Sequence, residues 1–169
     1  WLGAPTEPML GHITGTSSSL LMVDGVLLAP FGKLRGIDPS NGDVLWEGAA
    51  WPHYGTPGIM NVDGQAVIIT PGGEIIRPSD GETIGPNIGQ IEYVGPVVVG
   101  DTVYSIGWTR LEDGKTTVTI GRAHKLFGEE GGRIGVRKLW ERHLSKERTY
   151  ASPLIKDGRI FVLYWQGKL

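Results

Sequence analysis

A repeated pattern constrains this 169-residue chain more than any other feature of its sequence. Each copy has a cluster of small residues, an apolar segment, a turn that contains aspartate, and a second apolar segment. The copies cover residues 17–28, 56–69, 95–104 and 152–162. Their turn aspartates lie 39, 38 and 56 residues apart, at Asp24, Asp63, Asp101 and Asp157. The chain therefore repeats about every 39 residues, with one longer unit.

A tyrosine supports the same spacing independently. Tyr54, Tyr93 and Tyr150 precede the last three copies and lie 39 and 57 residues apart. The longer third unit has two candidate insertions. The polar segment 110–115 would extend a hairpin. Residues 125–133 contain the run Gly-Glu-Glu-Gly-Gly, for which we expect irregular structure.

The segments between the turns are typical of short strands. Asp-Gly and Asn-Gly pairs tolerate the positive φ angles that tight hairpins require. The intervening segments are rich in β-branched and aromatic residues, and no long segment has a helical period. Four short antiparallel strands in roughly 40 residues are typical of a β-propeller blade. We predict an all-β propeller with blades at residues 17–47, 56–86, 95–142 and 152–169, the last incomplete.

Residues 35–46 carry the most specific motif, Arg-Gly-Ile-Asp-Pro-Ser-Asn-Gly-Asp-Val-Leu-Trp. The motif resembles the repeat of the pyrroloquinoline-quinone-like (PQQ-like) propeller family, with Asp38, Gly42 and Trp46 at matching positions. The resemblance implies that Trp46 docks between adjacent blades, that Gly42 forms the turn, and that Asp38 fixes that corner by hydrogen bonds. Trp140 follows the same pattern later in the chain.

The second unit departs from this family pattern. Arg77 stands where aspartate is expected, and Gly85 or Pro86 where tryptophan is expected. The fourth unit stops before its own aspartate and tryptophan. We therefore interpret residues 1–169 as one partial propeller of about 3.5 blades. It is either a fragment of a longer ring or half of a ring that a second copy completes.

Charge is distributed unevenly along the chain. Residues 1–109 carry three basic and eleven acidic residues, whereas residues 110–169 carry thirteen basic and seven acidic ones. The basic residues are densest over 133–148. This segment is either a patch for an anionic partner or a solvated edge strand or insertion loop whose charges discourage aggregation. It lacks the aromatic platform and motifs of a nucleic-acid binder, so we expect no nucleic-acid partner.

The sequence contains no recognisable catalytic motif. It has no cysteine, its four histidines are too far apart for a short-range zinc pair, and no apolar run is long enough for a membrane helix. We interpret the chain as a non-catalytic interaction or scaffold module without a cofactor, binding a protein partner or a second copy. The resemblance implies a periplasmic or extracellular location. The alternative is a fragment of a quinoprotein dehydrogenase that uses pyrroloquinoline quinone and calcium.

Overall fold

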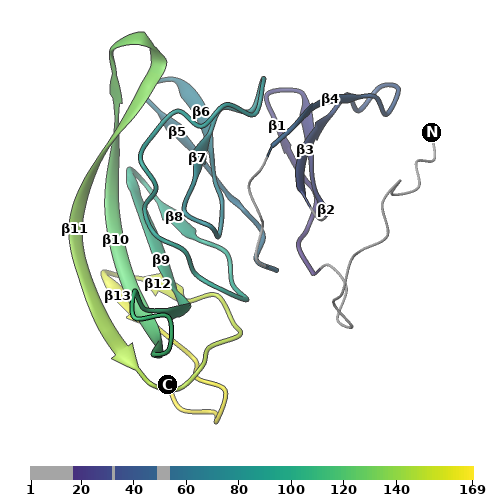
Figure 1. The fold of residues 1–169 in the computed structure, drawn as a ribbon. Coiled ribbons are helices and arrows are strands. Elements are labelled where there is room, and N and C mark those ends of the chain that lie inside the picture. The colour runs from purple at the N-terminus through teal and green to yellow at the C-terminus, as the bar shows by residue number, and fades with distance from the viewer. Residues whose placement is uncertain (1–16, 32, 49–53) are drawn as a thin grey trace.

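The computed structural model describes residues 17–31, 33–48 and 54–169, which form successive antiparallel sheets (Figure 1). Sheet 1 consists of β1 (Leu21–Val23), β2 (Val26–Phe31), β3 (Lys33–Ile37) and β4 (Val44–Glu47). Sheet 2 consists of β5 (Gly58–Val62), β6 (Gln65–Ile69) and β7 (Ile75–Ile76). Sheet 3 consists of β8 (Val97–Val99), β9 (Thr102–Arg110), β10 (Thr117–Glu129) and β11 (Arg133–Ser145). A short 3₁₀ turn, η1 (Glu130–Gly132), joins β10 to β11, and a last hairpin pairs β12 (Leu154–Lys156) with β13 (Arg159–Phe161).

Each sheet is a meander in which strands adjacent in sequence are adjacent in space. Sheets 1, 2 and 3 lie side by side in chain order (Figure 1). Repeated antiparallel meanders that pack face to face are the architecture of propeller blades. The structure therefore confirms the predicted all-β, propeller-type fold.

The hairpin turns follow from the repeated aspartates. Asp24 and Asp63 have φ angles of 47° and 51°, and each precedes a glycine that also has a positive φ. Two consecutive positive φ angles match the right-handed twist of the paired strands. The turn at Asp24 therefore pairs Val23 with Val26 in the β1–β2 hairpin.

Two apolar clusters hold the sheets together. The cluster between sheets 1 and 2 contains Val23, Val26, Leu28, Leu34, Trp46, Ile68 and Ile76. The cluster between sheets 2 and 3 contains Met60, Val62, Val67, Ile69, Ile75, Ile84, Ile88, Val103, Leu126 and Ile134. Sheet 2 thus buries one face against sheet 1 and the other against sheet 3.

Sheet 2 departs from the four-stranded pattern. It has three strands, and the place of a fourth is taken by an isolated bridge between Ile76 and Thr83. Pro86 follows closely and has no backbone N–H to continue a ladder. The same Gly85–Pro86 pair that replaces the expected tryptophan therefore coincides with the loss of the outer strand.

The longer third unit extends two hairpins. Leu111 N donates to Thr116 O at 2.8 Å across the tip between β9 and β10. Residues 125–129 continue β10, so the irregular structure predicted for 125–133 is limited to η1. Gly131 and Gly132 both have positive φ angles there, 71° and 73°. The inserted residues therefore mainly lengthen the paired strands β10 and β11, and do not form an irregular loop.

Candidate docking surface

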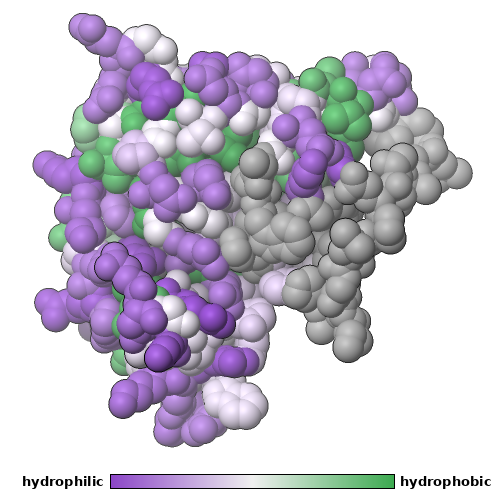
Figure 2. Space-filling model, in the orientation of Figure 1, coloured by the Kyte–Doolittle hydropathy of each residue, from purple (hydrophilic) through white to green (hydrophobic). Residues whose placement is uncertain are grey.

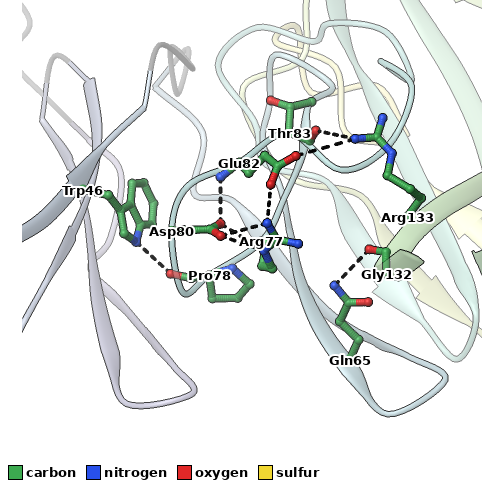
Figure 3. Close-up of polar contacts among 9 residues, drawn as sticks. All are labelled: Trp46, Gln65, Arg77, Pro78, Asp80, Glu82, Thr83, Gly132 and Arg133. Atoms are coloured by element: carbon green, nitrogen blue, oxygen red, sulfur yellow. Dashed lines mark hydrogen bonds and ion pairs between the residues drawn. The ribbon is translucent and has the colours of Figure 1, made fainter. Parts of the chain in front are cut away.

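Trp46 lies in a narrow slot between sheets 1 and 2. Its indole crosses Gly36 on the neighbouring strand, where an added Cβ would lie 2.2 Å from Nε1. On the other side, a Cβ on Gly81 would lie 2.5 Å from the ring. Nε1 donates a hydrogen bond to Pro78 O at 2.8 Å (Figure 3). Glycine is thus required on both sides of the ring because any side chain would overlap the indole.

Asp38 and Gly42 form the turn that precedes Trp46. Gly42 has a φ of 88°, and its N–H donates to Asp38 O at 2.8 Å. The Asp38 carboxylate accepts hydrogen bonds from the Ser40 hydroxyl and the Ser40 backbone N–H, and these bonds hold its pKa below the ordinary value. Both residues therefore stabilise the turn between β3 and β4.

The turn over Trp46 is stabilised by Arg77, which stands at the position of Asp38 one repeat later. Its guanidinium bonds to Asp80 and Glu82, two carboxylates of the same turn (Figure 3). The ion pair raises the pKa of Arg77 and lowers that of Asp80, in both cases chiefly through their mutual hydrogen bond. Arginine in this place thus closes the turn by ion pairing where the first unit uses an aspartate–serine contact.

The other side of sheet 2 is covered by the long β10–β11 hairpin of the next unit. Ile134 N donates to Ile84 O at 2.9 Å, and Arg133 contacts Thr83 O at 3.2 Å (Figure 3). Near the hairpin tip, Gly128 N donates to the Asp63 carboxylate at 2.8 Å. The unit that lacks a tryptophan is therefore joined to its neighbour by the inserted hairpin.

Trp140 lies on β11, the outer strand of sheet 3, as Trp46 lies on the outer strand of sheet 1. Its ring is near Gly121, where an added Cβ would lie 3.0 Å from it, and 6.4 Å from the ring of Tyr104. Trp140 is half-buried, whereas Trp46 is buried. Within the described part of the chain, no turn covers Trp140 in the way that Gly81 covers Trp46.

The surroundings of Trp140 are apolar and basic. Phe127, Leu139 and Leu144 are exposed by 41%, 46% and 39%. An open groove of about 770 Å³, which Trp140 does not line, lies at the preceding residues and is lined by Lys125, Phe127, Val136, Arg137 and Lys138. Figure 2 shows hydrophobic patches between hydrophilic side chains on the side formed by β10 and β11. We call residues 137–144 the β11 surface.

The one carboxylate of the β11 surface is paired with cations. Glu141 accepts a hydrogen bond from Arg122 at 3.0 Å and lies 3.8 Å from Lys138. Partial burial works to raise the pKa of Glu141, but the hydrogen bond and the two positive charges outweigh it and lower the pKa. Arg137 and Arg142 are also exposed on β11, on the opposite face of the sheet. The surface therefore carries net positive charge.

The three phased tyrosines meet in space. The rings of Tyr54 and Tyr93 stack at 5.8 Å, and Tyr150 meets Tyr93 edge-on at 5.0 Å. Tyr54 and Tyr93 have φ angles of 68° and 69°, which are uncommon for bulky residues. Because the rings occupy each other's faces, we assign this row to packing between units. The fixed spacing marks these residues in the sequence, but the stacking depends on how the sheets are arranged.

The described residues offer no metal centre. No three His, Asp or Glu side chains in that part of the chain are grouped closely enough to bind an ion. His124 is buried on β10 and His143 is exposed on β11, while His12 and His53 lie outside the described residues. Within the described ranges, no helix is long and apolar enough to cross a membrane.

Comparison with known proteins gives information on the fold. No family model matches the chain, and no curated protein matches it. The crystal structure of the computationally designed Ika8 protein is similar, with a TM-score of 0.52 and 13% identity over 94% of this chain. The crystal structure of BamB from Moraxella catarrhalis gives a TM-score of 0.47 and 14% identity over 86% of this chain. The match covers 46% of either solved chain, so this chain spans about half their length. The likeness to Ika8 shows a shared fold.

Proposed function

We propose that this chain is a non-catalytic propeller-repeat module of the PQQ-like type that binds a protein partner through the β11 surface. The observation that carries the proposal is the contrast between the buried, covered Trp46 and the half-buried Trp140. Large aromatic residues surrounded by arginine and apolar groups are enriched at the centres of protein interfaces. The proposal also includes a periplasmic or extracellular location, which is supported by the resemblance of residues 35–46 to exported families.

The chemistry of the partner follows from the charge of the surface. Arg137, Lys138 and Arg142 are exposed, and Glu141 is already paired with Arg122. A protein with acidic residues around an apolar anchor would complement this surface. Association should therefore weaken as the salt concentration rises.

A photo-cross-linking residue placed at Leu139 tests the proposal. Leu45 provides a matched control, because it precedes Trp46 as Leu139 precedes Trp140 and is similarly exposed, at 51%. We expect an extract of the source organism to give a cross-linked protein at position 139 and not at position 45. The identified partner, once purified, should bind the Arg137→Glu/Arg142→Glu double variant at least tenfold more weakly. Equal cross-linking at both positions, or unchanged affinity of the double variant, would contradict the proposal.

A further inference from the structure

The outer edge of sheet 3 is unusually long. β11 has 13 residues, whereas β4, the outer strand of sheet 1, has four. Propellers ordinarily leave only short, protected strand edges, because a long edge presents unpaired N–H and C=O groups to any other chain. Neighbouring blades pack mainly on the faces of a blade, and the preceding unit reaches this edge near its start, where Ile84 bonds to Ile134.

The hydrogen bonds of β11 show which backbone groups point outward. Ile134 N donates to Ile84 O, on the side of β11 away from β10. Backbone groups of alternate residues point the same way along a strand, so those of Val136 and Lys138 also point outward. In the described part of the chain, neither residue makes a backbone hydrogen bond on that side. Val136 and Lys138, two successive outward-facing positions on this edge, are therefore available to pair with another strand.

The side chains beside this edge define the complementary sequence. By register, Arg137 and Trp140 lie on one face of sheet 3, opposite Lys125 and Ala123. Lys138 lies on the other face, opposite His124. Side chains of an added strand would alternate between these faces, and each face places a cation beside the edge. On the second face Lys138 already lies 3.8 Å from Glu141. Acidic residues therefore complement the edge chiefly on the face of Arg137 and Trp140.

We propose that the partner docks by strand addition, with an extended acidic segment pairing with the outer edge of β11 at Val136 and Lys138. This inference rests on the proposed function and specifies its binding mode. Main-chain hydrogen bonds supply affinity in this mode, and alternate side chains supply specificity. The basic residues have two effects here: they repel another copy of the same edge and attract an acidic strand.

Two substitutions at Lys138 separate strand addition from attraction by charge. Lys138→Pro removes the outward N–H at a place where an edge strand tolerates proline. Lys138→Thr removes the same charge and keeps the N–H. The probe is a synthetic nine-residue peptide that alternates glutamate with valine, and its binding is measured by calorimetry at low salt. We expect Lys138→Thr to bind a few-fold more weakly than the natural sequence, and Lys138→Pro at least tenfold more weakly than Lys138→Thr.

Amide hydrogen exchange of the unsubstituted protein gives a second measurement that does not depend on how the proline variant folds. The bound peptide should slow exchange at the Lys138 and Val136 amides. Equal affinity of the two variants, unchanged amide exchange, or no binding of the peptide would overturn strand addition. The proposed function would still stand if cross-linking at Leu139 captured a partner sensitive to charge reversal, and would fail together with the inference if it did not.

Discussion

Trp46 and Trp140 lie on the outer strands of their sheets, yet their surroundings differ. Trp46 lies between Gly36 and Gly81 and donates to Pro78 O. Trp140 has a small residue, Gly121, beneath it and is half-buried. The comparison teaches that a tryptophan on the outer strand needs a second, separately supplied surface. Where the next repeat supplies it, the indole joins two sheets, and where none of the described residues does so, the indole stays partly exposed to water.

Removing each indole gives the largest expected difference. Trp46→Ala should reduce the free energy of unfolding by about 3–5 kcal/mol, as for a large aromatic residue removed from a core. Trp140→Ala should cost less than half as much, because its ring is already partly exposed to water. Denaturant unfolding of both variants measures this difference. Equal losses, or a loss below about 1 kcal/mol for Trp46→Ala, would remove the basis of the comparison.

The inserted hairpin should be nearly as important for sheet 2 as Trp46 is for sheet 1. Ile134 is 1% exposed and belongs to the cluster between sheets 2 and 3. Ile134→Ala should cost about 2–5 kcal/mol. Leu139→Ala, at an exposed position on the same strand, is the control and should change stability by about 0.5 kcal/mol or less. Similar losses for the two variants would mean that the hairpin does not secure sheet 2.

The glycine that covers Trp46 allows a finer test. Gly81 and Gly25 have similar positive φ angles, 74° and 78°, but an added Cβ has no atom within 4 Å at Gly25. Gly25→Ala therefore reports the backbone cost alone, about 1 kcal/mol. Gly81→Ala adds the overlap with Trp46, and we expect it to cost a further ~1–3 kcal/mol. Thermal or chemical unfolding that gives equal costs would show that Gly81 is not required as the cover of the ring.

The smallest expected effect concerns the pH dependence of stability that arises from His124, which is buried on β10. Burial, followed by the positive charges of Arg122 and Lys138, lowers the pKa of His124 in spite of Glu141. The unfolded chain therefore takes up a proton below about pH 6.5 that the folded chain resists. The stability associated with neutral His124 is present above this pH and lost as pH falls, at up to about 1.4 kcal/mol per pH unit.

Comparing the natural sequence with His124→Gln isolates this contribution. The stability advantage of the natural sequence over the variant should shrink between pH 7.5 and pH 5.5 in chemical unfolding experiments. An advantage that stays constant over this interval would show that His124 does not resist protonation in the folded state.

Local sequence is sufficient to predict the fold, because each turn is determined by residues next to each other. The turn aspartates at Asp24, Asp63, Asp101 and Asp157 mark the hairpins, and their spacing marks the successive units. The motif around Trp46 also marks a residue that the structure places between two sheets. These features depend on contacts within one unit or between one unit and the next.

Other features depend on contacts between distant segments. The bond between Ile134 and Ile84 joins residues 50 positions apart, and no local pattern around Gly128 predicts that β10 continues through it. The stacking of Tyr54 and Tyr93 likewise depends on how two sheets are placed. The β11 surface is the clearest case, because the basic segment has the same sequence whether it repels other strands or binds one.

The covers of sheets 1 and 2 come from later in the chain: Pro78 and Gly81 cover Trp46, and β11 covers Ile84. During synthesis the N-terminal part leaves the ribosome first, so the most recently made unit always has one uncovered apolar face. That face is closed when the following unit arrives. The molecule is therefore suited to assembly in one direction, and a pause between units would prolong the exposure of one face at a time.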